Sequence, residues 1–597
     1  METRRHSSAT SEDRENTPPP SQPAKSTKGG WKAIKYIIGN ESFEKLASMS
    51  LVMNMTVYLR SNYNMSGIFL VNVVSIWIGT CNISSLAGAF LSDAYIGKFL
   101  TLLYGSFASL LGMGMMTLTA GVPKFKPPKC STNHLNCVQP ENWQLGLLFI
   151  GLGLLALGAG GLRPCGIAFG ADQFDTTTPK GKKQLESFFN LWYLSFTVAL
   201  IVALTVVVYI QTNISWVIGF AIPTFFLFSS VTIFLIGRHT YVVKKPEGSV
   251  FTDIVQVIVA SIRKRKVPYD HNKNYSFYHP QNDDNLEQKN VARTQRFKCL
   301  EKAAMIVDPS EVNANGVAEN KWRLCSVQQV ENLKCVVGIL PIWVSGMGCM
   351  LVIDQQSTFG VLQAMQMTRK IGRKFMIPPG WMSEISMITL SIWIFIYEGI
   401  YIPKLMKLLK RDSRLTMVMR IRLGIIMSIF CMVTAALTER KRRDSSLEND
   451  TYIAPIHIYW LIPQFMLSGL TEAFNSVAIM EFFTTQMPEN MRTVASAIFF
   501  ITLSISSYLS SLIVNIIHKL TRSNGRTPWL GGHDLNKNKL DYYYFIIAGF
   551  GVLNMIYFTF IASKYVAPAK VIAVEKELRT VEAGGSGRNL SGGHREL

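Results

Sequence analysis

Two carboxylates and one ammonium group lie close together near the start of the first long apolar segment of the chain. Glu41, Glu44 and Lys45 are spaced three and four positions apart, so they project from one face of a helix. Two carboxylates that share one cation on a buried face can take up and release a proton near neutral pH. The spacing therefore predicts a proton-binding triad. The alternative is an ordinary surface ion pair at the start of a helix, because the triad lies near the end of the segment.

A cation also lies at the end of an apolar segment further along the chain. Arg163 follows the glycine-rich stretch 158–161 and precedes Pro164. The glycines allow neighbouring helices to approach closely. A charge at bilayer depth costs several kcal/mol unless it is paired or hydrated. The carboxylates of Glu41 and Glu44 are the expected partners of this guanidinium group.

Polar residues in the second half of the chain are candidates for contact with a solute. Glu472 lies well inside an apolar segment, where a charged residue marks function by default. Asp354 and Gln355 lie at the end of the seventh segment, and Glu384 lies near the start of the eighth. A position at a segment boundary explains Asp354 and Glu384 equally well. We predict that the substrate contacts Glu472, Gln355, Asp354 and Tyr58.

The elements that must position these residues are transmembrane helices. A helix needs about 20 mostly apolar residues to cross a bilayer. Backbone groups cannot be left unpaired in lipid, so segments of this kind are predicted to be helical. Twelve segments meet the requirement, some of them only marginally: 37–59, 69–92, 99–121, 143–167, 187–209, 215–237, 333–353, 381–403, 419–438, 456–478, 492–517 and 541–563.

The composition agrees with an all-α polytopic membrane protein. Charged residues make up 17% of the 597 residues and the mean hydropathy is +0.21, whereas a soluble chain carries about a quarter charged residues. One long polar interruption divides the twelve segments six and six, as in a transporter built from two six-helix bundles. We therefore predict a disordered cytoplasmic N-terminal tail (1–36), an N-terminal bundle (37–237), a cytoplasmic central loop (238–332), a C-terminal bundle (333–563) and a disordered cytoplasmic C-terminal tail (564–597).

The net charge of +21 orients the chain in the bilayer and does not indicate a nucleic-acid-binding protein. With the N-terminus inside, most Lys and Arg residues fall on the inner side, which agrees with the positive-inside rule. The basic run 439–443 is an exception, because it is predicted to lie outside. The basic run 263–266 either contacts anionic lipid headgroups or forms the solvated face of a loop helix. The N-terminal tail has no signal-peptide pattern.

The nine cysteines include no pair with CxxC spacing and no cluster with the spacing of metal ligands, so neither a metal nor a cofactor is expected. Cys130 and Cys137 fall in a loop predicted to lie outside, where they either form a disulfide or remain free. Asn64, Asn213 and Asn449 begin N-glycosylation sequons on the same side. Each sequon is a weak signal, since the tripeptide is common by chance.

The charged residues belong to longer motifs that resemble the plant nitrate/peptide transporter family. That family is part of the proton-coupled oligopeptide transporters of the major facilitator superfamily. The similarity covers roughly residues 30–565. The motifs that carry it are the triad itself and the positions 93–98, 160–165, 169–175, 187–190, 321–327, 341–343, 463–464, 472–474, 481–483, 486, 488, 491–492, 535–536 and 540–542.

The resemblance implies a major facilitator fold of twelve transmembrane helices and proton-driven symport by alternating access. Glu41, Glu44 and Lys45 would couple transport to protons, Arg163 would be their basic partner, and Glu472 would face the substrate. The family pattern also has three departures in this chain. No histidine occurs in the seventh span, where Ile353 stands in its place, and Gly338 and the pair Glu398-Gly399 replace charged family residues.

These departures argue against nitrate binding through an imidazole. They leave open nitrate itself and organic solutes such as a glucosylated metabolite or a hormone. The expected partners are protons, a small-molecule substrate and the lipid bilayer, and the plasma membrane is favoured over the vacuolar membrane. Two alternatives remain, an uncoupled facilitator or exporter of the same fold and a membrane receptor that senses a solute. An enzyme is not expected, because the chain has no GxSxG, HExxH or P-loop motif.

Overall fold

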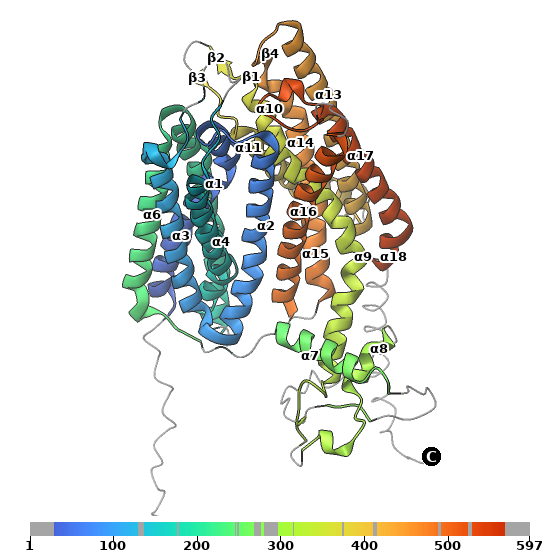
Figure 1. Ribbon diagram of the computed structural model, residues 1–597. Helices are drawn as coiled ribbons and strands as arrows, with labels where there is room; N and C mark the ends of the chain where they lie inside the picture. Colours follow the sequence, from blue (N-terminus) through green and yellow to red (C-terminus); the bar gives the residue numbers. More distant parts are fainter. Residues whose placement is uncertain are drawn as a thin grey trace, which may run out of the picture.

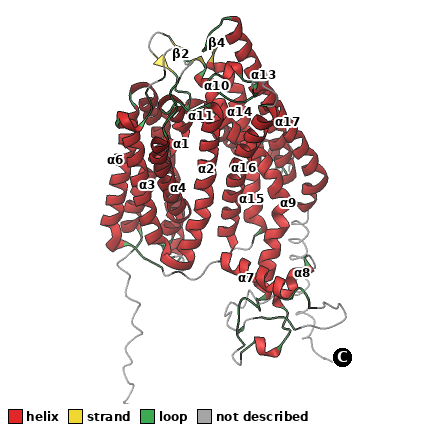
Figure 2. Cartoon of the chain, viewed as in Figure 1, coloured by secondary structure: helices red, strands yellow, loops and turns green. Residues whose placement is uncertain are grey.

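The computed structural model describes residues 29–566, apart from 129, 131–136, 176–177, 245, 247–249, 268–275, 280–296, 314–315, 373–374, 410–414, 488–490 and 523–527. The tails predicted at 1–36 and 564–597 lie largely outside these residues. The described chain consists of long helices with four short strands (Figures 1 and 2). The strands pair β1 (Met367–Thr368) with β4 (Ala454–His457) and β2 (Lys370–Ile371) with β3 (Phe375–Met376).

The first group of helices forms the N-terminal bundle. It begins with α1, which starts at Trp31 and therefore earlier than the apolar segment predicts. The helix α5 begins at a proline, and its N-terminus is capped by the hydroxyl of Thr178, which accepts a hydrogen bond from the backbone N–H of Gly181. The bundle comprises α1 (Trp31–Asn62), α2 (Gly67–Leu91), α3 (Gly97–Gly121), α4 (Asn142–Ala171), α5 (Pro179–Val202) with the π-helical turns η3 (Ala203–Val207) and η4 (Ile210–Ile214), and α6 (Trp216–Ile236).

The second group forms the C-terminal bundle. Several of its helices contain π-helical turns, which often lie at functional sites. It comprises α9 (Val327–Gln355) with η9 (Gln356–Gly360) and α10 (Val361–Met365), α11 (Trp381–Ile396) with η10 (Tyr397–Tyr401) and α12 (Ile402–Leu409), α13 (Met417–Glu448), α14 (Ile462–Thr471), η12 (Glu472–Ser476) and α15 (Val477–Gln486), α16 (Arg492–Thr521), and α17 (Leu540–Tyr557) with η16 (Phe558–Ala562) and α18 (Ser563–Val566).

Each of the twelve predicted spans corresponds to a helix or a run of helices in the described chain. Nine helical stretches of the described residues are long and apolar enough to cross a membrane, and one of them, Gly67–Gly121, contains both α2 and α3. The remaining spans are α1 and the α14–α15 run, which carry more polar residues. The described chain is thus an all-α polytopic arrangement.

Glycines allow the helices of the N-terminal bundle to pack closely, as the stretch 158–161 predicted. The backbones of α2 and α4 approach each other so nearly that a methyl group on Gly88 would lie 1.9 Å from the carbonyl oxygen of Gly160. On the other side of α4, a methyl group on Gly158 would lie 2.0 Å from the hydroxyl of Ser109 in α3. Any side chain at Gly88 or Gly158 would therefore push the helices apart.

Hydrogen bonds between the two bundles gather toward the end of the molecule where α1 ends and α2 begins. This is the end predicted to face outward. The bonds run from that end to about the middle of α2, and they place the two bundles in a state that is closed on this side. They are Asn64–His533, Gly67–Gly532, Asn72–Asn515, Asn72–Ser511, Ser75–Asp354, Gly79–Ser504, Thr80–Tyr508, Thr56–Ser357, Leu204–Trp381 and Asn213–Met376.

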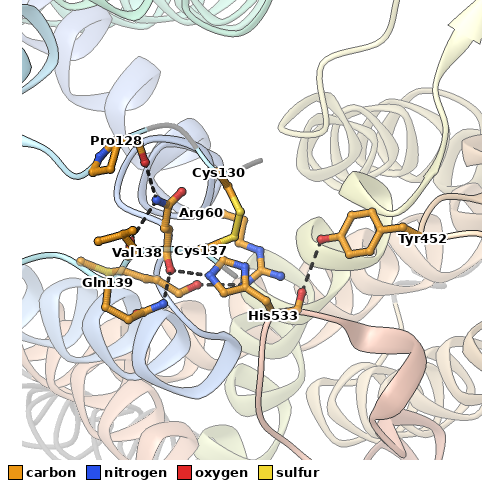
Figure 3. Close-up of a disulfide and its surroundings, with 10 residues drawn as sticks. Arg60, Pro128, Cys130, Cys137, Val138, Gln139, Tyr452 and His533 are labelled. Atoms are coloured by element: carbon orange, nitrogen blue, oxygen red, sulfur yellow. Dashed lines mark hydrogen bonds between the residues drawn. A yellow bond between two sulfur atoms is a disulfide. The ribbon is translucent and has the colours of Figure 1, made fainter. Parts of the chain in front are cut away.

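A disulfide between Cys130 and Cys137 closes the loop after α3, which resolves the two alternatives that the sequence left open (Figure 3). Backbone carbonyls beside the disulfide hold Asn64, whose side-chain amide donates to Pro128 (2.9 Å) and Val138 (3.1 Å). The carbonyl oxygen of Asn64 in turn accepts from Gln139 and contacts the ring of His533. The disulfide loop thus supports a contact between the two bundles.

Only one of the three sequons presents a well-exposed asparagine. Asn64 is buried, with its amide nitrogen occupied, and Asn213 is partly buried and donates to the carbonyl of Met376. Asn449 is exposed at the end of α13. We expect Asn449→Gln to remove an N-linked glycan, seen as a gel shift of the protein expressed in a eukaryotic membrane, and Asn64→Gln to leave the mobility unchanged. A glycan on Asn64 would contradict the packing of this loop.

Candidate functional site

The predicted proton-binding triad lies on α1 and is largely buried. Glu41 and Glu44 are each 5% exposed, so the alternative of a surface ion pair at the start of a helix is not what the structure shows. The ammonium of Lys45 lies 3.3 Å from the carboxylate of Glu44. That oxygen of Glu44 makes no hydrogen bond within the described chain. One of the two carboxylates, that of Glu44, therefore has a cation beside it.

The carboxylate of Glu41 lies against α4. A methyl group built on Gly166 would lie 1.6 Å from the Oε1 atom of Glu41, so the carboxylate occupies the space that this glycine leaves. Gly166 follows Arg163 by three positions, which is about one turn of the helix. The structure thus places the Glu41 carboxylate of α1 against α4, about one turn from Arg163.

Arg163 itself has a partner that the sequence did not suggest. Its guanidinium donates to the side-chain carbonyl of Asn82 in α2 at 2.8 Å. Within the described chain it forms no ion pair with Glu41 or Glu44, so the expected direct pairing is absent from this conformation. Asn82 has a neutral side chain in an apolar segment, and neither its type nor its spacing marks it as a partner of Arg163.

The space at Gly166 gives a specific test of the contact between α1 and α4. Gly166→Ala is expected to displace the Glu41 carboxylate and to lower uptake strongly, because overpacking of this kind costs about 1–3 kcal/mol and moves the group itself. The matched control is Gly153→Ala in the same helix, where a methyl group meets nothing within 4 Å. Both variants would be compared for uptake at equal surface expression. Equal uptake would show that the position of Glu41 does not matter.

Glu472 lies in the C-terminal bundle, at the point where the α-helix α14 passes into a π-helical turn. It is the first residue of the π-helical turn η12, between α14 and α15, and it is half-buried. Within the described chain its carboxylate has neither a hydrogen-bond donor nor a cation. A π-helical turn with an unpaired carboxylate is typical of a functional position. Contact of Glu472 with the substrate remains a prediction.

Asp354 and Gln355 lie at the junction of the two bundles. The hydroxyl of Ser75 in α2 donates to the carboxylate of Asp354 at 2.9 Å, across the bundle interface. Gln355 is fully buried, with its amide donating to Ser510 at 2.7 Å and its carbonyl accepting from Tyr543 at 2.9 Å. Both side chains therefore have partners in this conformation, and contact with a solute remains a prediction for them.

Tyr58 packs inside the N-terminal bundle. Its side chain is fully buried, and its ring contacts Phe220 with the ring centroids 4.8 Å apart. Its hydroxyl shares a hydrogen bond with Thr119 in α3 at 2.9 Å. The structure does not bring this residue together with Asp354 or Gln355. These contacts are those of a core residue, and a role in substrate binding remains a prediction.

The basic run 439–443 gives a polar cluster that the sequence did not reveal. Glu439 and Arg442 are both fully buried and form two hydrogen bonds of 2.8 Å with each other. Gln363 donates to Glu439, and Arg442 donates to Asn536. The sequence predicts a loop here, whereas α13 continues to Glu448. Two of the charged side chains, Glu439 and Arg442, therefore point into the protein, while Arg440 is exposed.

Comparison with known proteins gives the family. The model of the POT family, PTR2, matches residues 99–530. The protein NRT1/PTR FAMILY 2.8 of Arabidopsis thaliana is 56% identical over 548 residues, which are 92% of this chain and 97% of the relative. NRT1/PTR FAMILY 2.13 of the same plant is 43% identical over 542 residues, which are 90% of this chain and 87% of the relative.

Solved structures give the fold. The POT family transporter PepTSo has a TM-score of 0.64 at 17% identity, covering 89% of this chain and 98% of its own. A POT family transporter in complex with 5-aminolevulinic acid has a TM-score of 0.58 at 10% identity and covers 89% and 96%. The prediction of a major facilitator fold is thereby confirmed. The chain belongs to the POT family, is similar to its plant NRT1/PTR members, and is a multi-pass membrane transporter rather than an enzyme.

Proposed function

We propose that this chain is a proton-coupled symporter that moves a small solute by alternating access. The observation that carries the proposal is the burial of Glu41 and Glu44 on α1, with one carboxylate beside Lys45 and the other against α4. Protonation of a carboxylate changes its interaction with the nearby cations, and so changes the balance between two arrangements of the bundles. Arg163, which donates to Asn82 in this state, is the group whose partner would change.

The contacts between the bundles support alternating access. They lie toward the end predicted to face outward, and they consist largely of single hydrogen bonds between hydroxyl, amide and backbone groups. Bonds of this kind contribute only about 0.5–1.5 kcal/mol each. Among the described residues no ion pair joins the two bundles, so their separation breaks only weak contacts of this kind. In the proposed cycle, the described state is the one closed to the outside.

The proposed substrate is nitrate or an organic solute such as a glucosylated metabolite or a hormone. Helix α9 contains no histidine, and Ile353 stands at the position where nitrate-type members of the family would have one. The carboxylate of Glu472 would repel an anion such as nitrate and would suit a solute with hydroxyl or amine groups, so the organic solute is favoured. Solved relatives were crystallised with 5-aminolevulinic acid and with alafosfalin. The plasma membrane is the proposed location.

A voltage-clamp assay in oocytes tests the proposal. Nitrate, a glucoside and a hormone would each be applied at pH 5.5 and pH 7.5, with tracer uptake measured in parallel to detect electroneutral transport. Proton symport predicts solute-evoked uptake that grows at the lower pH. Uptake that does not depend on pH would show an uncoupled facilitator. Binding of a solute without uptake would show a receptor, and either result would overturn the proposal.

A further inference from the structure

The segment between the two bundles contains a helix that is apolar on two opposite faces. This helix, α7 (Val250–Arg263), is followed by short helical turns at α8 (Lys298–Glu301), η7 (Lys302–Ala304) and η8 (Pro309–Glu311). Val257 and Ala260 are fully buried in a cluster with residues at the start of α9. On the other side of α7, Val255, Ile258 and Ile262 are 47%, 41% and 57% exposed.

The spacing of these residues shows that the two faces are distinct. Val255, Ile258 and Ile262 follow one another by three and four positions, so they form one continuous stripe along the helix. Val257 and Ala260 fall on the opposite side. One apolar face is therefore explained by packing against the protein. The exposed stripe is not covered by any described part of the chain.

The basic run 263–266, which follows this stripe, also has one buried side and one exposed side. Lys264 is buried, and its ammonium donates to the carbonyl of Met305 at 2.7 Å and to Glu311 at 3.1 Å. Arg263, Arg265 and Lys266 are exposed. The sequence left two interpretations of this run open, lipid contact or a solvated face. The structure separates one buried, structural lysine from three exposed basic side chains.

The helix lies at the level where the spans of the C-terminal bundle end. Val250, Phe251 and Ile254 pack against a cluster that includes Met487 and Met491, between the end of α15 and the start of α16. In Figure 1, α7 runs across the ends of the helices of this bundle. Trp322, whose carbonyl accepts from Arg263 at 3.5 Å, is 42% exposed beside it. Aromatic side chains of this kind are enriched at membrane surfaces.

We propose that the exposed stripe of α7 and the three basic side chains at and just after its C-terminal end bind anionic phospholipid at the inner surface of the membrane. Val255, Ile258 and Ile262 would enter the boundary between headgroups and acyl chains, as interfacial amphipathic helices do. Arg263, Arg265 and Lys266 would contact the anionic headgroups, which collect on the cytoplasmic leaflet. The proposal concerns a surface outside the transport site and does not depend on the identity of the solute.

The exposed face of α7 could be covered by lipid or by the N-terminal bundle, and the positive charge of its basic side chains favours an anionic lipid surface. The N-terminal bundle also ends near this level, and it could cover α7 in another state of the transporter. The first turns of its helix α5 expose Lys180 and Lys183, however, and these positive charges would oppose the approach of Arg263, Arg265 and Lys266. An anionic membrane surface attracts them instead.

The test uses the full-length protein and two surface variants. Native mass spectrometry would measure the retention of phosphatidylserine and phosphatidylcholine, and hydrogen exchange in nanodiscs of either lipid would report on residues 250–263. The test variant carries Arg263→Gln, Arg265→Gln and Lys266→Gln. The matched control carries Lys180→Gln and Lys183→Gln, which are exposed lysines at the start of α5 in the other bundle.

The wild-type protein is expected to prefer phosphatidylserine and to protect 250–263 only in nanodiscs that contain it. The test variant should lose about fivefold in affinity for each basic side chain removed, and the control should keep both effects. Replacing the apolar stripe by serine should also remove the protection. Equal retention of the two lipids by the wild type would overturn the proposal. So would a preference that the test variant keeps, or protection that is independent of the lipid.

Discussion

Replacing Glu41 by glutamine is expected to abolish proton-driven uptake while the protein still reaches the membrane. Glutamine has nearly the same shape as glutamate, so the contact with Gly166 in α4 is retained. An amide cannot take up a proton, so the site no longer has two protonation states. Solute uptake driven by a pH gradient should fall at least about tenfold, which corresponds to roughly 1.4 kcal/mol or more of lost coupling.

Exchange of solute separates a loss of coupling from a loss of folding. Movement of labelled solute against unlabelled solute, without a pH gradient, needs both states of the transporter but no net proton transfer. We expect Glu41→Gln to keep this exchange in proteoliposomes. Glu448→Gln serves as the control, because this carboxylate is exposed at the end of α13. If Glu41→Gln retains the full pH-driven uptake of the wild type, Glu41 does not couple transport to protons.

Glu44→Gln should have a different effect. Its carboxylate lies 3.3 Å from Lys45, and the substitution leaves that ammonium without its neighbouring anion. Lys45 already interacts electrostatically with Glu41, and without Glu44 its attraction would act on Glu41 alone. Uptake in Glu44→Gln should therefore require a more acidic outer solution. A comparison of the two variants over the same pH range would show which carboxylate carries the proton.

Much of the fold could be predicted from the sequence, because the same physical requirement applies to every segment that crosses the lipid. An apolar segment that crosses a bilayer must pair its own backbone groups, so its length and composition are enough to identify it as a helix. The positions of the helix ends are predicted less accurately. Helix α13 runs past the predicted end at 438 to Glu448, because Glu439 and Arg442 neutralise each other inside the protein.

The candidate site was predictable only where it depended on helical spacing. Glu41, Glu44 and Lys45 lie on one helix, so their proximity follows from local geometry. The partner of Arg163 depends on how α2 and α4 pack, and the sequence held no sign that Asn82 would accept its hydrogen bond. Tyr58 shows the same limit, since a tyrosine suited to a solute also suits an aromatic core.

Replacing Arg442 by methionine is expected to destabilise the C-terminal bundle severely. The guanidinium is fully buried and donates to both oxygens of Glu439 and to Asn536. Without it, Glu439 would remain as a buried charge, with Gln363 as its one remaining partner in the described chain. Removal of one member of a buried ion pair costs about 3–5 kcal/mol. We expect a large fall in the melting temperature of the purified protein and little material at the membrane.

Two further variants distinguish the loss of the charge pair from the loss of a large side chain. Arg440→Met changes an exposed arginine in the same helix and should leave the melting temperature nearly unchanged. The double variant Glu439→Gln with Arg442→Met removes both charges, so it should recover much of the stability that Arg442→Met loses. If the double variant is as unstable as the single one, the shape of Arg442 and its bond to Asn536 stabilise the bundle. Recovery would show instead that the helix continues past its apolar segment because the two charges are paired.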